Sequence, residues 1–156
     1  MKWVQSLRGK MVGLDTAPII YYVEKNPLYY DMMLAFFQAV NGGECAAVTS
    51  VVTLLEGLVI PFRRNDINLV RDYYSLLYDT DDLTTISFFP NIAQQASRLR
   101  ASYKSMRTAD AIQIATAIQS NASFFLTNDT SLPSIPSLKI IVLEDLRKEK
   151  QSSTEP

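Results

Sequence analysis

The sequence contains no histidine. This absence excludes acid–base catalysis by imidazole, the Ser-His-Asp and Cys-His catalytic arrangements, and the usual zinc sites. If the protein is an enzyme, its chemistry must come from carboxylates, hydroxyls, lysine, tyrosine or a hard metal ion held by oxygen atoms.

Cysteine and long apolar runs are also scarce. The single cysteine, Cys45, lies in an apolar run, so we expect a buried free thiol and a reducing, cytoplasmic setting. No apolar run approaches the roughly 18–20 residues that a membrane span needs. The basic N-terminus lacks the pattern of a signal peptide. We therefore expect no membrane partner.

The sequence also has no large excess of one sign of charge, since the net charge is −1, from 15 basic and 16 acidic residues. This balance argues against a protein that coats polyanions with its whole surface, although it allows a local basic strip. The 156 residues are 47% hydrophobic, which favours one domain with a substantial core. We expect this domain to span residues 1–148, followed by a polar, disordered tail at 149–156.

Short apolar segments alternate with helical patterns along the chain. Strands are expected at residues 11–14, 44–49, 83–88, 124–127 and 139–143, and helices at 19–25, 28–40, 51–62, 67–78, 90–104 and 109–119. Thr16, Ser50 and Thr108 are the expected helix N-caps. This alternation predicts an α/β fold with a mostly parallel sheet of four to five strands covered by helices on both faces.

Most acidic residues fall in turns or on polar faces, where solvated surface is the simplest interpretation. Two others follow strands: Asp15 ends the first predicted strand, and Asp129 lies just beyond the strand at 124–127. Ligands of open α/β sheets bind outside the carboxyl ends of the strands, so these two acids can converge there. Taken singly, each is better explained as a turn or cap residue.

Glu56 is predicted to lie inside a helix. It shares an i, i+3, i+4, i+7 stripe with Val52, Leu55 and Val59, so we expect it to be buried or at the margin of the core. A buried lone carboxylate is costly unless it is paired, protonated or bound to a metal. The alternative is a helix-edge glutamate that reaches solvent or an arginine.

Asp110 is predicted in the first turn of a helix, where an acid favours the helix dipole without any further role. It also shares a face with Ile114, Ala117 and Ile118, which points it toward the core. Four carboxylates that converge would repel one another unless a divalent cation lies among them. Mg²⁺ and Mn²⁺ take oxygen ligands and can activate water against a phosphodiester.

Four motifs around these acids resemble those of the PIN-domain family, and most of all the bacterial VapC-type toxin ribonucleases. They read V-G-L-D-T-A after an apolar segment, T-S-V-V-T-L-L-E-G, T-A-D-A-I-Q-I-A-T-A, and F-L-T-N-D-T-S-L. Each motif is weak alone, but their order, spacing and placement carry the resemblance across residues 11–145. The chain departs from many relatives in two ways: about ten residues precede the first strand, and Ser131-Leu132 replaces an acidic–aromatic pair.

The resemblance implies a PIN-like three-layer α/β/α fold and Mg²⁺- or Mn²⁺-dependent cleavage of RNA. By the resemblance, Asp15, Glu56, Asp110 and Asp129 form the catalytic metal site, with support from Thr16, Thr127 and Asn128. It further implies a homodimer and a small antitoxin partner that holds the protein inactive, often through a basic side chain in the acidic site.

Several basic and aromatic residues are candidate RNA contacts. Arg98, Arg100, Lys104 and Arg107 precede the third acid and could contact phosphates, although scattered surface charge is the simpler interpretation. Five tyrosines at helical spacing are better explained as core or dimer contacts than as platforms for bases: Tyr29, Tyr30, Tyr73, Tyr74 and Tyr78.

Three other enzyme or signalling families fit less well. The D-T-A and D-T-S triplets at 15–17 and 129–131 resemble aspartic proteases, but that fold is all-β. A haloacid-dehalogenase-like phosphatase would need an acid where Ala17 stands, and a receiver domain would need an acidic pair at the first strand. The rival from another class is a PIN-like RNA- or protein-binding module whose site is catalytically silent.

Overall fold

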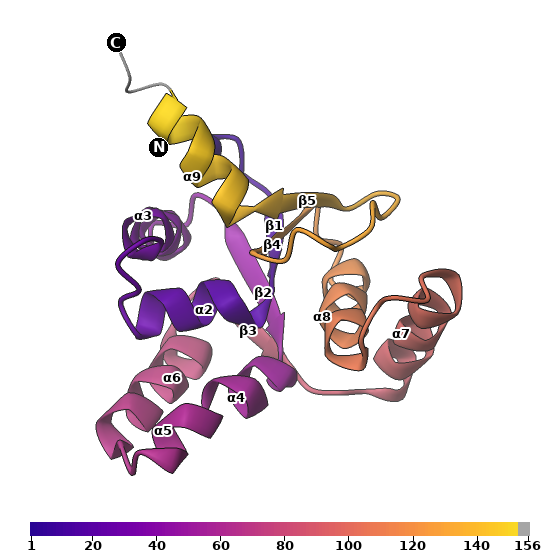
Figure 1. The fold of residues 1–156 in the computed structure, drawn as a ribbon, viewed down its shortest axis with the longest axis horizontal. Helices are drawn as coiled ribbons and strands as arrows, with labels where there is room; N and C mark the ends of the chain where they lie inside the picture. Colours follow the sequence, from indigo (N-terminus) through magenta and orange to yellow (C-terminus); the bar gives the residue numbers. More distant parts are fainter. Residues whose placement is uncertain (153–156) are drawn as a thin grey trace.

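A parallel sheet runs through the middle of the molecule in the computed structural model, which describes residues 1–152 (Figure 1). Its strands are β1 (Met11–Leu14), β2 (Ala46–Ser50), β3 (Leu83–Ile86), β4 (Phe124–Thr127) and β5 (Lys139–Val142). They pair in parallel in the order β3-β2-β1-β4-β5. The central strands are mostly apolar because both of their faces are covered, and their polar residues Thr49, Ser50 and Thr127 lie at the carboxyl ends.

Helices cover both faces of this sheet. They are α1 (Lys2–Gln5), α2 (Thr16–Val23), α3 (Tyr30–Asn41), α4 (Val51–Gly57), α5 (Val59–Arg63), α6 (Ile67–Asp79), α7 (Pro90–Ser102), α8 (Thr108–Gln119) and α9 (Leu143–Ser152). Figure 1 shows α2, α3 and α6 on one side and α7 and α8 on the other. The predicted three-layer α/β/α architecture with a five-stranded parallel sheet is confirmed.

The two faces of the sheet are packed differently. The face under α2, α3 and α6 is filled by large side chains such as Phe36, Phe37 and Tyr73. The face under α8 combines large side chains such as Phe125 and Ile114 with alanines of α8 that allow a close approach to the sheet. A Cβ added to Gly13 on β1 would lie 2.5 Å from the Cβ of Ala117 on α8, so only glycine permits this approach. The close contact places α8 firmly against the middle of the sheet.

Several predicted helix ends differ from the observed ones. Asp15, not Thr16, is the N-cap of α2, and Arg107, not Thr108, precedes α8. Ser50 is confirmed as the N-cap of α4, since its side chain accepts a hydrogen bond from the Val52 N–H at 3.1 Å. The single helix predicted at 51–62 is divided into α4 and α5 at Leu58.

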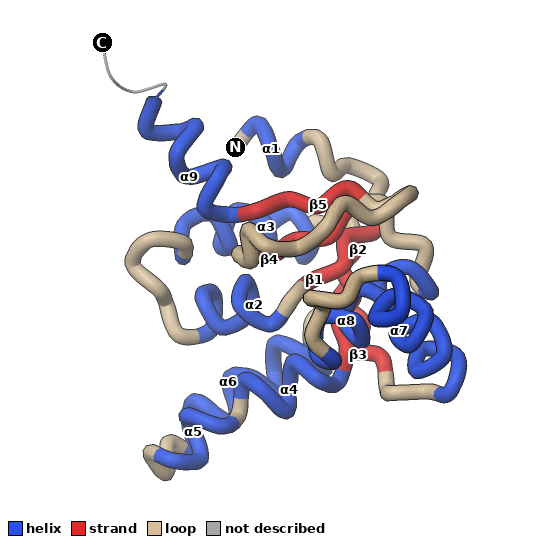
Figure 2. Tube along the Cα trace, turned by 45° about the vertical axis from the view of Figure 1, so that its right-hand side comes forward, coloured by secondary structure: helices blue, strands red, loops and turns tan. Residues whose placement is uncertain are grey.

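The ends of the described chain lie close together (Figure 2). The residues before β1 form α1 and a turn, Leu7 is fully buried, and the Trp3 ring stacks on Phe36 with centroids 6.2 Å apart. The predicted disordered tail is wrong for residues 149–152, which continue α9. The rest of that tail, residues 153–156, lies outside the described residues. Among residues 1–152, no helix is long and apolar enough to cross a membrane.

Candidate active site

A hollow of about 440 Å³ opens at the carboxyl edge of the sheet. It is lined by Asp15, Thr16, Ala17, Ile20, Tyr21, Glu56, Arg107, Asp110, Asn128 and Asp129, and we call it the acidic hollow. It lies where the strand order reverses, because β1 is followed in sequence by β2 on one side and later by β4 on the other. Such switch points are where open α/β sheets bind ligands. The structure thus brings the four predicted acids to one place.

Asp15 is held rigidly where β1 becomes α2. One carboxylate oxygen accepts a hydrogen bond from the Thr16 N–H at 2.8 Å, and the other accepts from the Thr127 hydroxyl at 2.7 Å. Burial raises the pKa of Asp15, and the Asp110 and Glu56 carboxylates raise it further, while the bonds from Thr127 and Thr16 work against the shift. The group is therefore a partly buried acid among other acids, in the kind of environment that a bound cation would relieve.

Asp129 is tied to the same threonine from the other strand. Its backbone N–H donates to the Thr127 hydroxyl oxygen at 3.0 Å. Its carboxylate accepts hydrogen bonds from the Ser131 hydroxyl and N–H, at 2.6 and 2.8 Å. These bonds, together with the charge of Arg107, hold the pKa of Asp129 below its usual value. Thr127 therefore links Asp15 and Asp129, the two acids that follow β1 and β4.

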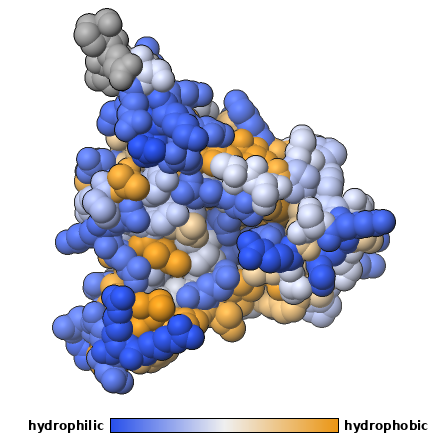
Figure 3. All heavy atoms as spheres, viewed as in Figure 1, coloured by the Kyte–Doolittle hydropathy of each residue, from blue (hydrophilic) through white to orange (hydrophobic). Residues whose placement is uncertain are grey.

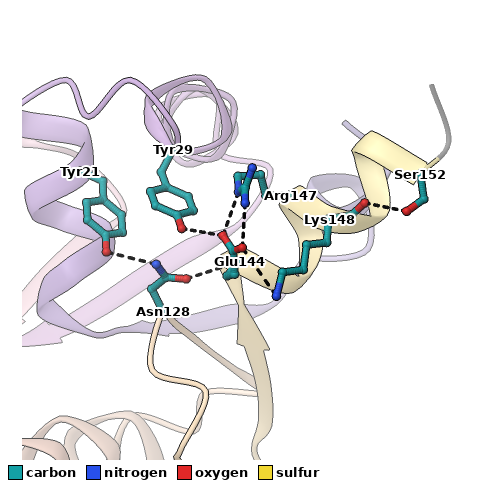
Figure 4. Close-up of polar contacts among 7 residues, drawn as sticks. All are labelled: Tyr21, Tyr29, Asn128, Glu144, Arg147, Lys148 and Ser152. Atoms are coloured by element: carbon teal, nitrogen blue, oxygen red, sulfur yellow. Dashed lines mark hydrogen bonds and ion pairs between the residues drawn. The ribbon is translucent and has the colours of Figure 1, made fainter. Parts of the chain in front are cut away.

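Asn128 anchors the loop that follows β4, which carries Asp129, to the C-terminal helix (Figure 4). Its amide nitrogen donates to the Tyr21 hydroxyl oxygen at 3.1 Å, and its amide oxygen accepts from the Glu144 N–H at 2.9 Å. The Tyr21 ring stacks on Tyr29 with centroids 4.6 Å apart, and the Tyr29 hydroxyl donates to the Glu144 carboxylate at 2.7 Å. These contacts tie Asn128 to α2 and α9, and its role in orienting the loop stays a prediction.

Asp110 has both a structural and a site-facing position. Its carboxylate accepts a hydrogen bond from the Arg107 N–H at 3.2 Å at the start of α8, and lies 3.6 Å from the Arg107 Nε. The Asp110 side chain is 17% exposed, whereas that of Arg107 is 82% exposed. The guanidinium thus lies over the rim of the hollow, where it can meet an incoming anion.

Glu56 reaches the hollow by a different route from the one predicted. The expected buried stripe is wrong, because Leu55 is 70% exposed and Val59 is 42% exposed, and Glu56 itself is exposed. The inward positions of α4 are Thr53 and Gly57. One Glu56 carboxylate oxygen accepts a hydrogen bond from the Thr16 hydroxyl at 2.7 Å. The acid is therefore positioned by a side chain of α2.

Sequence reasoning missed a buried polar cluster beneath the acidic hollow. Gln113 of α8 is 2% exposed and donates hydrogen bonds to Thr16 and Thr53. Thr49 and Ser50 at the end of β2 complete this cluster. The signal in the sequence was a single amide within the otherwise small and apolar helix T-A-D-A-I-Q-I-A-T-A.

The ligands on offer in the acidic hollow are oxygen atoms of carboxylates, hydroxyls and an amide. This set fits Mg²⁺ or Mn²⁺, because Mg²⁺ usually keeps several waters and needs one or two carboxylates. Among residues 1–152, however, no three acidic side chains lie close enough together to hold one ion. Direct coordination by all four acids stays a prediction.

The predicted basic contacts are only partly assembled. Arg107 lines the hollow, whereas Arg98, Arg100 and Lys104 are exposed residues on or just after α7 that do not line it. Their contact with RNA stays a prediction. Of the tyrosines expected as core or dimer contacts, Tyr29 and Tyr73 are buried in the core and Tyr30 is half-buried. Tyr74 and Tyr78 are 48% and 52% exposed, so a dimer contact stays a prediction for them.

The fold and the acidic hollow define a class that comparison with known proteins confirms. A family model described as the PIN domain matches residues 13–138, which includes all four acids. The chain belongs to the PIN domain family. No curated protein matches it.

Solved structures share this fold at low sequence identity. VapBC2 from Rickettsia felis, bound to a DNA fragment from its promoter, aligns with a TM-score of 0.67 and 18% identity over 85% of this chain and 98% of that one. A toxin–antitoxin complex from Klebsiella pneumoniae gives 0.61 and 20%, over 86% and 98%. FitAcB from Neisseria gonorrhoeae gives 0.58 and 17%, over 86% and 98%. At these identities the likeness shows the fold.

Proposed function

We propose that this protein is a Mg²⁺- or Mn²⁺-dependent endoribonuclease, the VapC-like toxin of a toxin–antitoxin pair. The observation that supports it most is the placement of Asp15, Glu56, Asp110 and Asp129 around one hollow at the switch point of the sheet. Two of these acids come from strand ends and two from helices. Carboxylates gathered around one hollow repel one another unless a cation lies among them, and charges taken out of water are paired or coordinate metals.

The side chains of the hollow would divide the work of phosphodiester cleavage. A bound divalent ion would stabilise charge on the phosphodiester and activate a water. Asp15 presents a carboxylate fixed by Thr127 and Thr16, and Asp129 presents one fixed by Ser131. Arg107 at the rim would contact a phosphate and hold the RNA backbone over the acids.

Partners of the kind seen in the similar complexes also have a candidate surface. Exposed apolar side chains gather on the region of α4, α5 and α6, including Leu55, Phe62 and Ile67 at 70%, 56% and 53% exposure. Figure 3 shows hydrophobic atoms over the same region. Exposed apolar side chains gathered on one region favour a protein partner, and we assign this region to a small antitoxin or to a second copy of the chain. A short antitoxin-like reading frame beside the gene would support the antitoxin as the partner. We place the protein and its RNA substrate in the cytoplasm.

Cleavage of RNA by the purified protein tests the proposal directly. With Mg²⁺ or Mn²⁺ the wild type should cut, and a chelator should stop cleavage until the metal is restored. Asp15→Asn and Asp110→Asn should each abolish cutting, whereas Asp72→Asn on the exposed face of α6 should not. Equal cutting by all four proteins, or none by any under either metal, would leave the silent binding module as the better interpretation.

A further inference from the structure

We infer that Gln113 is a positioning residue that aims the hydroxyl proton of Thr16 at the Glu56 carboxylate. This inference deepens the proposed function and rests on it for its catalytic consequence. Gln113 lies in the first turns of α8, three residues after Asp110, and its side chain points beneath the acidic hollow rather than into it. It is 2% exposed and does not line the hollow, so any effect on the site must pass through its partners.

The orientation of the Gln113 amide is fixed by the backbone. Its oxygen accepts a hydrogen bond from the Ser50 N–H at 3.1 Å, and that N–H can only donate. The amide nitrogen must therefore face the other way, toward Thr16 and Thr53. The oxygen and nitrogen ends, which distances alone do not distinguish, are thus assigned by chemistry.

The two amide hydrogens of Gln113 then determine what the threonine hydroxyls do. The amide nitrogen donates to the Thr16 hydroxyl oxygen at 3.1 Å and to the Thr53 hydroxyl oxygen at 2.7 Å. Each hydroxyl has one proton of its own. The Thr16 proton is directed to Glu56, whose oxygen lies 2.7 Å away.

The hydroxyl protons of Thr49 and Thr53 are directed away from Thr16 and Glu56, and their chain of hydrogen bonds ends on a backbone carbonyl. The Thr49 hydroxyl donates to the Leu14 carbonyl oxygen at 3.0 Å. Its oxygen is therefore free to accept from Thr53, 2.7 Å away. The Thr16 and Thr53 oxygens are farther apart, at 3.3 Å. The Thr49 hydroxyl also lies 3.5 Å from the Gln113 amide oxygen, farther than from the Leu14 carbonyl oxygen. Each threonine hydroxyl thus has one closest acceptor, and Glu56 is the acceptor for Thr16.

The consequence is a fixed direction for Glu56, which is otherwise an exposed side chain on a short helix. The side chains beneath the hollow are between 0% and 6% exposed: Gln113, Thr49, Thr53 and Thr16. Water therefore does not compete for their hydrogen bonds. Groups that orient metal-binding carboxylates in this way typically change metal affinity or activity by about 10–100-fold when they are removed.

A double-mutant cycle separates this role from simple stabilisation. The variants are Gln113→Met, which keeps length but removes the amide, Thr16→Val, and the two combined. Gln119→Met, on the exposed end of the same helix, is the matched control. The measurements are the affinity of the RNA-free protein for Mn²⁺ alone by calorimetry, kcat and KM for RNA cleavage, and the melting temperature.

Gln113→Met should weaken Mn²⁺ binding and lower kcat by about tenfold or more, with KM for RNA little changed. Thr16→Val should do the same, and the double variant should be no worse than Thr16→Val, because Gln113 acts through Thr16. Multiplicative losses in the double variant would overturn the inference. So would a lower melting temperature with unchanged kcat and Mn²⁺ affinity.

A second variant tests the direction of the hydrogen bond. Gln113→Glu keeps the shape and, at a pH at which its carboxyl group is ionised, offers acceptors only, so Thr16 would donate to that carboxylate instead of Glu56. Loss of Mn²⁺ affinity supports the inference, and wild-type affinity contradicts it. If neither Gln113 variant folds, NMR of the wild type decides: the Thr16 hydroxyl proton should exchange slowly and lie close to the Gln113 amide. A freely exchanging hydroxyl would overturn the inference.

Failure of the proposed function looks different from failure of this inference. If the wild type never cuts RNA, the nuclease proposal falls, while Mn²⁺ affinity and the NMR measurement still test Gln113. If the wild type cuts and the cycle is multiplicative, the nuclease proposal stands and Gln113 is an ordinary buried side chain.

Discussion

Asp15 and Glu144 follow parallel strands at the same edge of the sheet, β1 and β5, yet the electrostatic surroundings of their carboxylates are opposite. Glu144 is neutralised: Arg147 donates to both of its oxygens at 2.8 Å, and Tyr29 donates at 2.7 Å (Figure 4). Within residues 1–152, Asp15 receives hydrogen bonds but contacts no cationic side chain, and it faces two further carboxylates.

The difference separates a structural carboxylate from a functional one. The contacts of Glu144 are complete within the chain and join α9 to the loop at Asn128. Asp15 is held just as firmly but keeps an unfavourable electrostatic environment, which folding energy from elsewhere must offset. A group that is rigid yet electrostatically uncompensated is a candidate binding site, since a ligand can supply the missing charge.

The largest expected effect comes from removing the bond that fixes Asp15. Thr127→Val deletes the hydroxyl that donates to Asp15 and accepts from the Asp129 N–H, at a position that is 0% exposed. Buried groups that lose such partners cost about 1–3 kcal/mol, so the free energy of unfolding should fall by that amount. RNA cleavage should fall as well.

Thr116→Val is the matched control for this change. Thr116 is 1% exposed, but its hydroxyl donates to the Ile112 carbonyl within its own helix. That carbonyl keeps its helical N–H partner, so the loss in urea denaturation should be much smaller. Equal losses for the two variants would mean that Thr127 acts by packing alone, and that Asp15 is held no more specifically than any core residue.

A smaller effect, with a distinctive sign, is expected for Asp15→Asn in metal-free buffer. The pKa of Asp15 is raised in the folded state above its usual 3.8, chiefly by burial. The folded protein therefore loses stability as pH rises through that raised pKa, whereas the asparagine variant has no charge to bury. Relative to the wild type, the variant should become more stable as pH rises from below 3.8 to neutral.

Denaturation in urea across this pH range, with a chelator present, measures the change. Added Mn²⁺ should then stabilise the wild type and not the variant, since only the wild type gains from binding. A relative stability that is flat with pH would show that Asp15 is not electrostatically strained, and the contrast with Glu144 would be lost.

The sequence predicted the parts of this site that depend on strand ends. Asp15 and Asp129 follow apolar segments, and parallel strands bring such positions to one edge whatever the details of packing. Helix caps were less predictable, because Asp15 and Thr16 are both good caps and their contacts with Thr127 and Glu56 decide between them.

The remaining parts depend on packing that no local pattern reveals. The stripe through Glu56 was wrong because α4 turns Thr53 and Gly57 inward, and Gly57 fits there since a Cβ would lie 2.7 Å from the Tyr73 ring. Gln113 could be seen as unusual, but its partners lie 60 to 97 residues away in sequence. Its role appears only when α8 is placed on the sheet.

The smallest expected effect, opposite in sign to that of Asp15, belongs to Glu144. Hydrogen bonds from Arg147 and Tyr29 lower the pKa of Glu144 from 4.5 to about 2. The stability that this charge contributes is complete above pH 4.5 and is lost as pH falls toward 2. Glu144→Gln should therefore be less stable than the wild type at neutral pH, with most of the difference lost as pH falls from 4.5 to 2. Because the pair with Arg147 is close to solvent, the difference should also shrink in high salt.

Melting temperatures of both proteins across this pH range, at low and high salt, provide the measurement. A difference that is as large at pH 2 as at neutral pH would mean that the carboxylate holds α9 by shape and not by charge. The two acids would then differ in packing, and the electrostatic argument for the acidic hollow would have to rest on Asp15 alone.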